Sequence, residues 1–167
     1  MHDLSPPESV HALDVTKLKD PDITFWTVRD GTLLLGCGAL KQLDAEHGEV
    51  KSMRAPVALR GRGAGRAVLA HIIRVARDRG YKRLSLETGS MKAFAPAQRL
   101  YESFEFRYCE PFGDYRSDPN SVFMTLRLGT LCGSIRIRYR LPHEHCIIKY
   151  IARVFVCPRR TAARAAG

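Results

Sequence analysis

A glycine cluster that opens an amphipathic helix constrains the fold of this chain most. Residues 60–66 read Arg-Gly-Arg-Gly-Ala-Gly-Arg, and the apolar side chains that follow have the i, i+4 spacing of one helical face as far as Gly80. Glycines let the backbone take positive φ and approach a ligand closely, and the free N–H groups of a first helical turn attract negative charge. The segment therefore predicts a helix that starts with either a diphosphate cradle or a plain glycine-rich turn.

Strand patterns surround this helix on both sides. Asp30-Gly31 is a hairpin turn signal, and the glycines at 36 and 38 indicate a bulge or a close backbone approach within the following strand. The order strand–strand–strand–helix–strand–helix–strand predicts one mixed α/β domain that ends near residue 128. The expected strands cover residues 23–28, 33–40, 49–53 with an extension to about 57, 83–88 and 122–128, and the second helix covers 95–104.

Two well-known nucleotide-binding loops do not fit the glycine cluster. No Gly-Lys-Ser/Thr follows it, which argues against a Walker-type loop. A Rossmann site needs an acidic residue at the end of a strand roughly 20 residues further on. Glu87 is the acid nearest that distance, but it lies inside the Leu-Glu-Thr of a strand.

Composition favours a globular protein of the cytosol. The chain is 45% apolar and 26% charged, and it holds no apolar run long enough for a membrane helix. Its N-terminus has no apolar stretch typical of a secretory signal. The five cysteines include no Cys-x-x-Cys pair, which argues against a disulfide framework. We expect a cytoplasmic protein without a membrane partner.

The basic charge is concentrated in the tail. The net charge is +10, and residues 129–167 hold eight Lys or Arg residues and one acid. A nucleic-acid partner is therefore expected only through this tail. Residues 134–141 alternate like a strand that would replace a missing edge strand, and the apolar residues of 147–155 have the spacing of one helical face. The Cys and His residues of the tail lack regular ligand spacing, so we expect no metal.

Beyond the loop, the residues resemble the GCN5-related N-acetyltransferases (GNATs). Arg60-x-x-Gly63-x-Gly65 matches their signature, and the elements from about residue 8 to 128 match in order and spacing. A subgroup of small bacterial acetyltransferases is the most similar. Further matching segments are Glu-Val-Lys-Ser-Met-Arg at 49–54, Leu-Ser-Leu-Glu-Thr-Gly-Ser-Met at 84–91 and Pro-Phe-Gly-Asp-Tyr at 111–115.

The resemblance implies a mixed, mostly antiparallel sheet flanked by helices. It places a GNAT domain at 1–128, whose first strand is missing, and leaves a basic tail of unknown structure at 129–167. It also implies acetyl-CoA as cosubstrate, with its pyrophosphate on the loop amides and its pantetheine arm paired like an added strand. The implied cofactor-binding residues are Met53, Arg54, Ala55, Arg60, Gly61, Arg62, Gly63, Ala64, Gly65 and Arg66.

The family's catalytic positions also have counterparts here. Glu49 lies eleven residues before Arg60, where many members carry the base that deprotonates the amine, usually through water. Tyr101 lies where a tyrosine commonly protonates the leaving thiolate. Glu87 is a competing candidate for the base. The plainer interpretations are that Glu49 is an exposed strand carboxylate and that Tyr101 only packs within its helix. His47 is expected to be a turn residue.

The implied reaction is acetyl transfer to an unidentified primary amine by direct attack, without an acyl-enzyme. The sequence leaves open whether the protein forms a homodimer. Residues 110–121 are expected to line the acceptor side. The chain departs from the family at Phe94, where an asparagine is usual, and at Glu105, where a glycine is usual. The basic tail and the missing first strand support an alternative, a catalytically decayed GNAT scaffold whose tail binds nucleic acid or protein.

Overall fold

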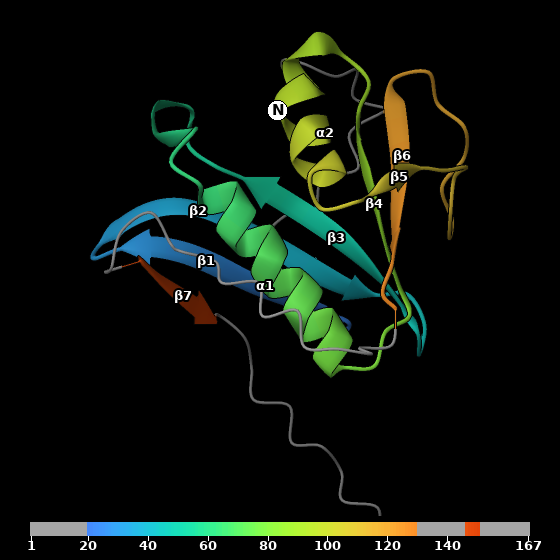
Figure 1. Cartoon of the computed structure of the whole chain (residues 1–167), viewed down its shortest axis with the longest axis horizontal. Helices are drawn as coiled ribbons and strands as arrows, with labels where there is room; N and C mark the ends of the chain where they lie inside the picture. Colours follow the sequence, from blue (N-terminus) through green and yellow to red (C-terminus); the bar gives the residue numbers. More distant parts are fainter. Residues whose placement is uncertain (1–19, 130–145, 151–167) are drawn as a thin grey trace, which may run out of the picture.

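The computed structural model describes residues 20–129 and 146–150, which form a seven-stranded sheet with the order β5-β6-β4-β3-β2-β1-β7 (Figure 1). Neighbouring strands run antiparallel except β3 and β4, which are parallel. The predicted mixed, mostly antiparallel sheet flanked by helices is confirmed. The elements are β1 (Ile23–Asp30), β2 (Leu33–Gln42), β3 (His47–Arg54), η3 (Val57–Leu59), α1 (Ala64–Asp78), β4 (Arg83–Gly89), η4 (Lys92–Phe94), α2 (Ala95–Glu102), β5 (Arg107–Tyr108), β6 (Ser121–Arg127) and β7 (Cys146–Tyr150).

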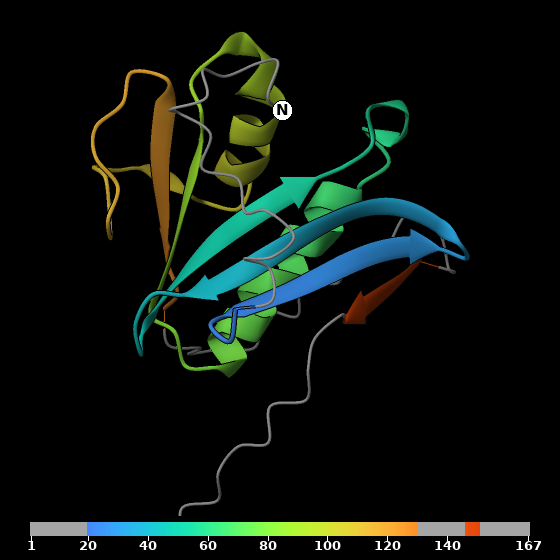
Figure 2. The same cartoon turned by 180° about the vertical axis from the view of Figure 1, so that it is seen from behind.

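Helix α1 packs closely on one face of the sheet because β2 has two glycines beneath it. A Cβ at Gly38 would stand 2.5 Å from Val68 Cγ1, and one at Gly36 would stand 3.3 Å from Ala64 Cβ. The close backbone approach predicted for these glycines is therefore confirmed. The predicted apolar face of the helix is buried, and Gly80, at φ +81°, follows its last turn. Figure 2 shows the opposite face of the sheet, which α1 leaves uncovered.

The parallel pair β3–β4 opens along its length. Their pairing covers only His47–Val50 against Arg83–Leu86, and the two strands then separate (Figure 1). A bulge in β3 accompanies the separation, because three residue steps from Lys51 to Arg54 face two steps on β2. Ser52 has φ +53° in this bulge. The sheet is thereby divided into a β1–β3 half and a β4–β6 half, with an open strand edge between them.

Several element ends differ from the sequence prediction by one to three residues, and two of the differences have a clear physical cause. β3 ends at Arg54 rather than near Val57, because Pro56 has no N–H for a strand and a single 3₁₀ turn, η3, follows it. Helix α2 ends at Glu102, two residues early, and Glu105 takes φ +69° in the turn behind it. The two-residue strand β5 was not predicted, since so short a pairing has no recognisable pattern.

One strand of the tail joins the sheet. Cys146–Tyr150 pairs antiparallel with Trp26–Asp30 as β7, so the helical interpretation of residues 147–150 is wrong. The physical reason is that β1 otherwise ends the sheet with a row of unpaired backbone groups, which an added strand satisfies. The alternating segment 134–141 and the expected absence of a first strand lie outside the described residues. The domain boundary at 128 stays a prediction. No helix in the described part of the chain is long and apolar enough to cross a membrane.

Candidate active site

The glycine loop ends as an uncapped helix N-terminus. Gly61 and Gly63 have φ +79° and +82°, conformations that residues with a Cβ rarely adopt, which is why glycines are needed there. Gly63 is the N-cap of α1, and no side chain caps the helix. The first-turn N–H groups, which begin at Ala64, therefore lack a capping side chain. Gly65 differs from the other two, because a Cβ there would stand 3.3 Å from Leu100 Cδ2 of α2.

The arginines of this loop do not share one role. Arg60 and Arg62 are exposed. Arg66 turns instead toward the end of α2, where it donates a hydrogen bond to Ser103 Oγ at 3.2 Å and stacks 4.8 Å from the ring centre of Phe104. All three arginines are exposed, and they differ in that Arg66 joins α1 to α2.

The predicted pantetheine strand lies along the open edge of β3. Met53 and Arg54 close this strand and Ala55 follows it, all beyond the last pair shared with β4. The Met53 side chain packs under α1, since its Sδ stands 2.6 Å from the position of a Cβ at Gly38. The Met53 side chain is thus packed against α1, whereas the backbone groups at this end of β3 lie beyond the pairing with β4.

Glu49 is buried within a hydrogen-bonded group on the sheet face opposite α1. Its side chain is on that face because its neighbour Val50 belongs to the core against α1. The residue is 2% exposed, so the interpretation as an exposed strand carboxylate is wrong. Tyr115 donates its hydroxyl to Glu49 Oε1 at 2.6 Å, and Lys51 Nζ donates to the same oxygen at 2.8 Å. The Lys51 ammonium also lies 5.2 Å from the centre of the Tyr115 ring.

The two other candidate residues, Glu87 and Tyr101, lie on β4 and α2. Glu87 Oε1 accepts a hydrogen bond from Ser121 Oγ at 2.8 Å. Tyr101 is 6% exposed and packs on Phe106, and burial, together with the Glu87 charge, raises the pKa of its hydroxyl. The group therefore stays protonated at neutral pH and keeps a proton to donate. The same two causes and the Glu49 charge raise the pKa of Tyr115.

His47 belongs to a chain of polar groups rather than to a turn. It is the first residue of β3 and 6% exposed. Arg83 donates to its Nδ1 at 3.0 Å, so Nε2 carries the proton and donates to Ser85 Oγ at 2.8 Å. Ser85 in turn bonds Thr125 at 3.2 Å, which bonds the Leu84 carbonyl oxygen at 3.1 Å. Burial and the Arg83 charge lower the pKa of His47, which keeps the imidazole neutral.

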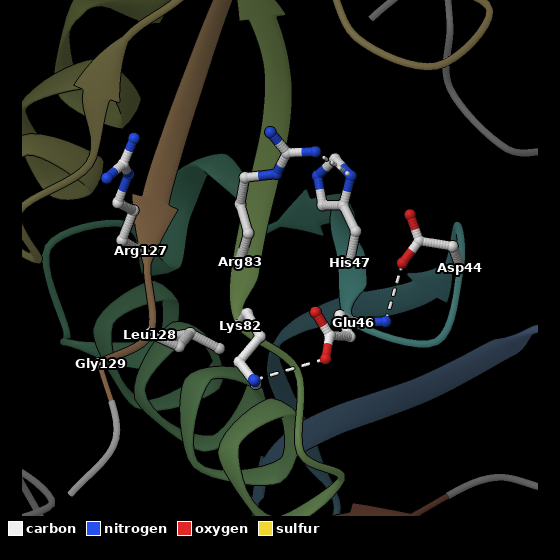
Figure 3. Close-up of a pocket in the computed structure, with 8 residues that line it drawn as sticks. All are labelled: Asp44, Glu46, His47, Lys82, Arg83, Arg127, Leu128 and Gly129. Carbon is white, nitrogen blue, oxygen red and sulfur yellow. Dashed lines mark hydrogen bonds and ion pairs between the residues drawn. The ribbon is translucent and has the colours of Figure 1, made fainter.

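A cavity of about 540 Å³ lies at this end of the sheet (Figure 3). It is at the start of β3, whereas the glycine loop follows the end of that strand. Lys82 pairs there with Glu46 at 3.4 Å, and Arg83 and Arg127 stand opposite each other on β4 and β6. The cavity therefore lies at the opposite end of β3 from the glycine loop, and His47 of β3 lines it.

Sequence reasoning missed the partners of Glu49. Lys51 follows it at i+2 and so shares its strand face, a signal that was available, whereas Tyr115 is 66 residues away and only the fold brings it near. The positive φ of Ser52 carried no signal, since serine is unusual in that conformation. Within the described ranges, no group of three or more His, Cys, Asp or Glu side chains is placed to hold a metal.

Solved acyltransferase structures share this fold. A crystal structure from Klebsiella pneumoniae, of a protein assigned as an acyl-CoA N-acyltransferase, superposes with a TM-score of 0.63. The two chains are 30% identical, and the match covers 70% of this chain and 80% of that one. A GNAT acetyltransferase from Elizabethkingia anophelis, solved with acetyl-CoA bound, shares the fold with a TM-score of 0.54 at 20% identity, over 64% and 77% of the two chains.

The chain belongs to the acetyltransferase (GNAT) family, whose model matches residues 2–106. It is 61% identical to YsnE of Bacillus subtilis, an uncharacterised N-acetyltransferase. This match spans 125 residues, which are 75% of this chain and 83% of that protein. The predicted family and the prediction of an acetyltransferase enzyme are thereby confirmed.

Proposed function

We propose that this protein is an acetyl-CoA-dependent N-acetyltransferase that transfers the acetyl group to a primary amine by direct attack. The observation that carries the proposal is that three features adjoin the separation of β3 from β4. These are a helix N-terminus without a side-chain cap, a strand edge that leaves its parallel neighbour, and a buried carboxylate beside that edge. A diphosphate, an amide-bearing arm and an amine each find a complementary group there.

The residues present fit acetyl-CoA. Its pyrophosphate suits the amides of 61–66, where the positive φ of Gly61 and Gly63 shapes the loop and the helix dipole favours negative charge. Exposed Arg60 and Arg62 add positive charge at the surface. The pantetheine amides suit the backbone edge from Met53 to Ala55. The related GNAT protein with acetyl-CoA bound supports this assignment.

Glu49 is proposed as the base. It accepts the proton of the substrate ammonium through a water molecule, because at 2% exposure its carboxylate has little surface for direct contact. The neutral amine then attacks the thioester carbonyl, so that the new C–N bond forms, the nitrogen releases its second proton to water, and the C–S bond breaks. Tyr101 gives its proton to the departing thiolate. Holding both reactants in one cleft supplies much of the rate through proximity.

The cysteines of the described part support direct attack over an acyl-enzyme. Burial raises the pKa of the Cys37 thiol, and Cys37 Sγ is turned to the Ser52 carbonyl oxygen at 3.6 Å. Burial also raises the pKa of the Cys109 thiol. Since the thiolate is the nucleophile, neither residue is activated for acyl transfer.

The proposal is tested by calorimetric titration of the full chain with CoA and, separately, with polyuridine RNA at two salt concentrations. We expect saturable CoA binding and, with acetyl-CoA present, acetylation of members of a panel of L-amino acids, polyamines and aromatic monoamines. Release of the CoA thiol measures the rate. Salt-dependent RNA binding without any response to CoA would overturn the proposal in favour of the decayed scaffold.

A further inference from the structure

The Glu49 carboxylate is held from one side by a tyrosine of a distant loop. We propose that Tyr115, together with Lys51, is a positioning residue that fixes the carboxylate of Glu49 with Oε2 free to accept the substrate's proton. The inference rests on the proposed base role of Glu49. It adds residues to which no role in the reaction has been assigned.

The hydrogen bonds to Glu49 distinguish its two carboxylate oxygens, because one is held by donors and the other is not. The Tyr115 hydroxyl at 2.6 Å and Lys51 Nζ at 2.8 Å both donate to Oε1. Within the described part of the chain, the Glu49 carboxylate accepts these two hydrogen bonds, and no donor contacts its second oxygen, Oε2. Two donors on one oxygen fix both the position and the rotation of a planar group, because a rotated carboxylate would lose both bonds.

The Tyr115 hydroxyl is a reliable donor because its ring is fixed by packing. The ring lies 5.2 Å from that of Phe112 and 5.5 Å from that of Phe123, measured between centroids. Phe112 belongs to the same loop, and Phe123 lies on β6. The segment expected to line the acceptor side thus also fixes the base.

The charges around Glu49 explain why both donors are needed. Lys51 supplies the positive charge that a buried carboxylate requires, and its side chain is 11% exposed. On the same face, β4 contributes Ser85 opposite Glu49 and the carboxylate of Glu87, while β2 contributes Lys41. Burial and the Arg83 charge lower the pKa of His47, which adds no positive charge on this face. Tyr115 adds a hydrogen bond without adding charge, and so favours the ionised base against the nearby Glu87 carboxylate.

The test compares Tyr115→Phe with a matched control. Phe keeps the ring packing and removes only the hydroxyl. Tyr108→Phe removes a similar hydrogen bond, since Tyr108 donates to Glu102 Oε1 at 2.8 Å, but that pair is on the surface. With acetyl-CoA and the amine of highest turnover in the panel, we expect Tyr115→Phe to lower kcat roughly 10- to 100-fold. We expect the KM for acetyl-CoA to stay within about twofold, and Tyr108→Phe to match the wild type.

Two further readouts separate positioning from general damage. Because a lost hydrogen bond to the charged form favours protonation, the acidic limb of the kcat profile moves to higher pH in Tyr115→Phe. The ¹³C-NMR titration of the Glu49 carboxyl, assigned by its loss in Glu49→Gln, moves in the same direction without any substrate. In the Glu49→Gln background, Tyr115→Phe has no further effect, since it acts through the missing base.

Each other outcome refutes one claim. An inactive Glu49→Gln beside a fully active Tyr115→Phe with an unmoved titration overturns the positioning role and leaves the proposed function standing. A Glu49→Gln protein with wild-type kcat overturns the base role itself. Additive losses in the double variant also overturn the inference, because Tyr115 would then act independently of Glu49.

Discussion

Replacing Glu105 by glycine should stabilise the protein. The residue follows α2 with φ +69°, although glycine is the residue that fits this conformation without strain. Its N–H donates to the Glu102 carbonyl oxygen at 2.9 Å, a backbone bond that glycine keeps. The Glu105 side chain is exposed, so its removal leaves no cavity.

The size of the effect follows from two opposing terms. A residue with a Cβ in the left-handed region costs about 1–2 kcal/mol relative to an unstrained conformation. Glycine costs about 0.5–1 kcal/mol because it loses more conformational freedom on folding. Loss of a negative charge behind the C-terminus of α2 adds a small gain through the helix dipole. The free energy of unfolding should therefore rise by about 0.5–1 kcal/mol.

Urea unfolding followed by the single tryptophan, Trp26, measures the change. With a slope of about 1.5 kcal/mol per M, the midpoint should rise by roughly 0.3–0.7 M at unchanged slope. Glu105→Ala is the matched control, since it removes the same charge but keeps the left-handed strain, and it should gain less than Glu105→Gly. An unchanged or lowered midpoint for Glu105→Gly, or an equal gain for Glu105→Ala, would refute the strain argument.

Three further predictions concern the site. Gly65→Val should weaken CoA binding by more than tenfold, about 1.4 kcal/mol, because a branched side chain meets Leu100 and displaces the helix start; calorimetry on a variant shown by circular dichroism to be folded measures it. Tyr101→Phe should lower kcat about tenfold while CoA binding is kept, and equal rates of thiol release in both proteins would contradict the acid role. The pKa of His47 is lowered on folding, so the unfolded chain binds more protons below pH 6.5. The contribution of neutral His47 to the free energy of unfolding is therefore present above that pH and is lost as the pH falls. Urea midpoints at pH 8 and pH 5 should differ less in His47→Asn than in the wild type.

Local patterns predicted most of the fold. The α1 face was read from its spacing, because burial on the sheet requires one apolar stripe, and the strands of the sheet interior were read from their apolar runs. The glycines at 36 and 38 signalled close packing before any neighbour was known. The ends of elements were less predictable, since Pro56 and the strain at Glu105 act on single residues.

The site was predictable only where one segment carries it. The glycine loop and Glu49 are adjacent to recognisable elements, and Lys51 follows from strand alternation. Tyr115 reaches Glu49 from a turn-rich loop without periodicity, and β7 pairs with β1 from more than a hundred residues away. Such long-range contacts depend on tertiary packing, which neither propensity nor spacing encodes.

The most direct test of the account is acetyl transfer by the purified full chain. Incubation with acetyl-CoA and the amine panel, followed by mass spectrometry of the amines, should yield products heavier by one acetyl group. The same product should be absent with Glu49→Gln, although that variant still binds CoA in calorimetry. A wild-type protein that binds CoA but acetylates no amine, or a Glu49→Gln variant that forms product at the wild-type rate, would contradict the proposed mechanism.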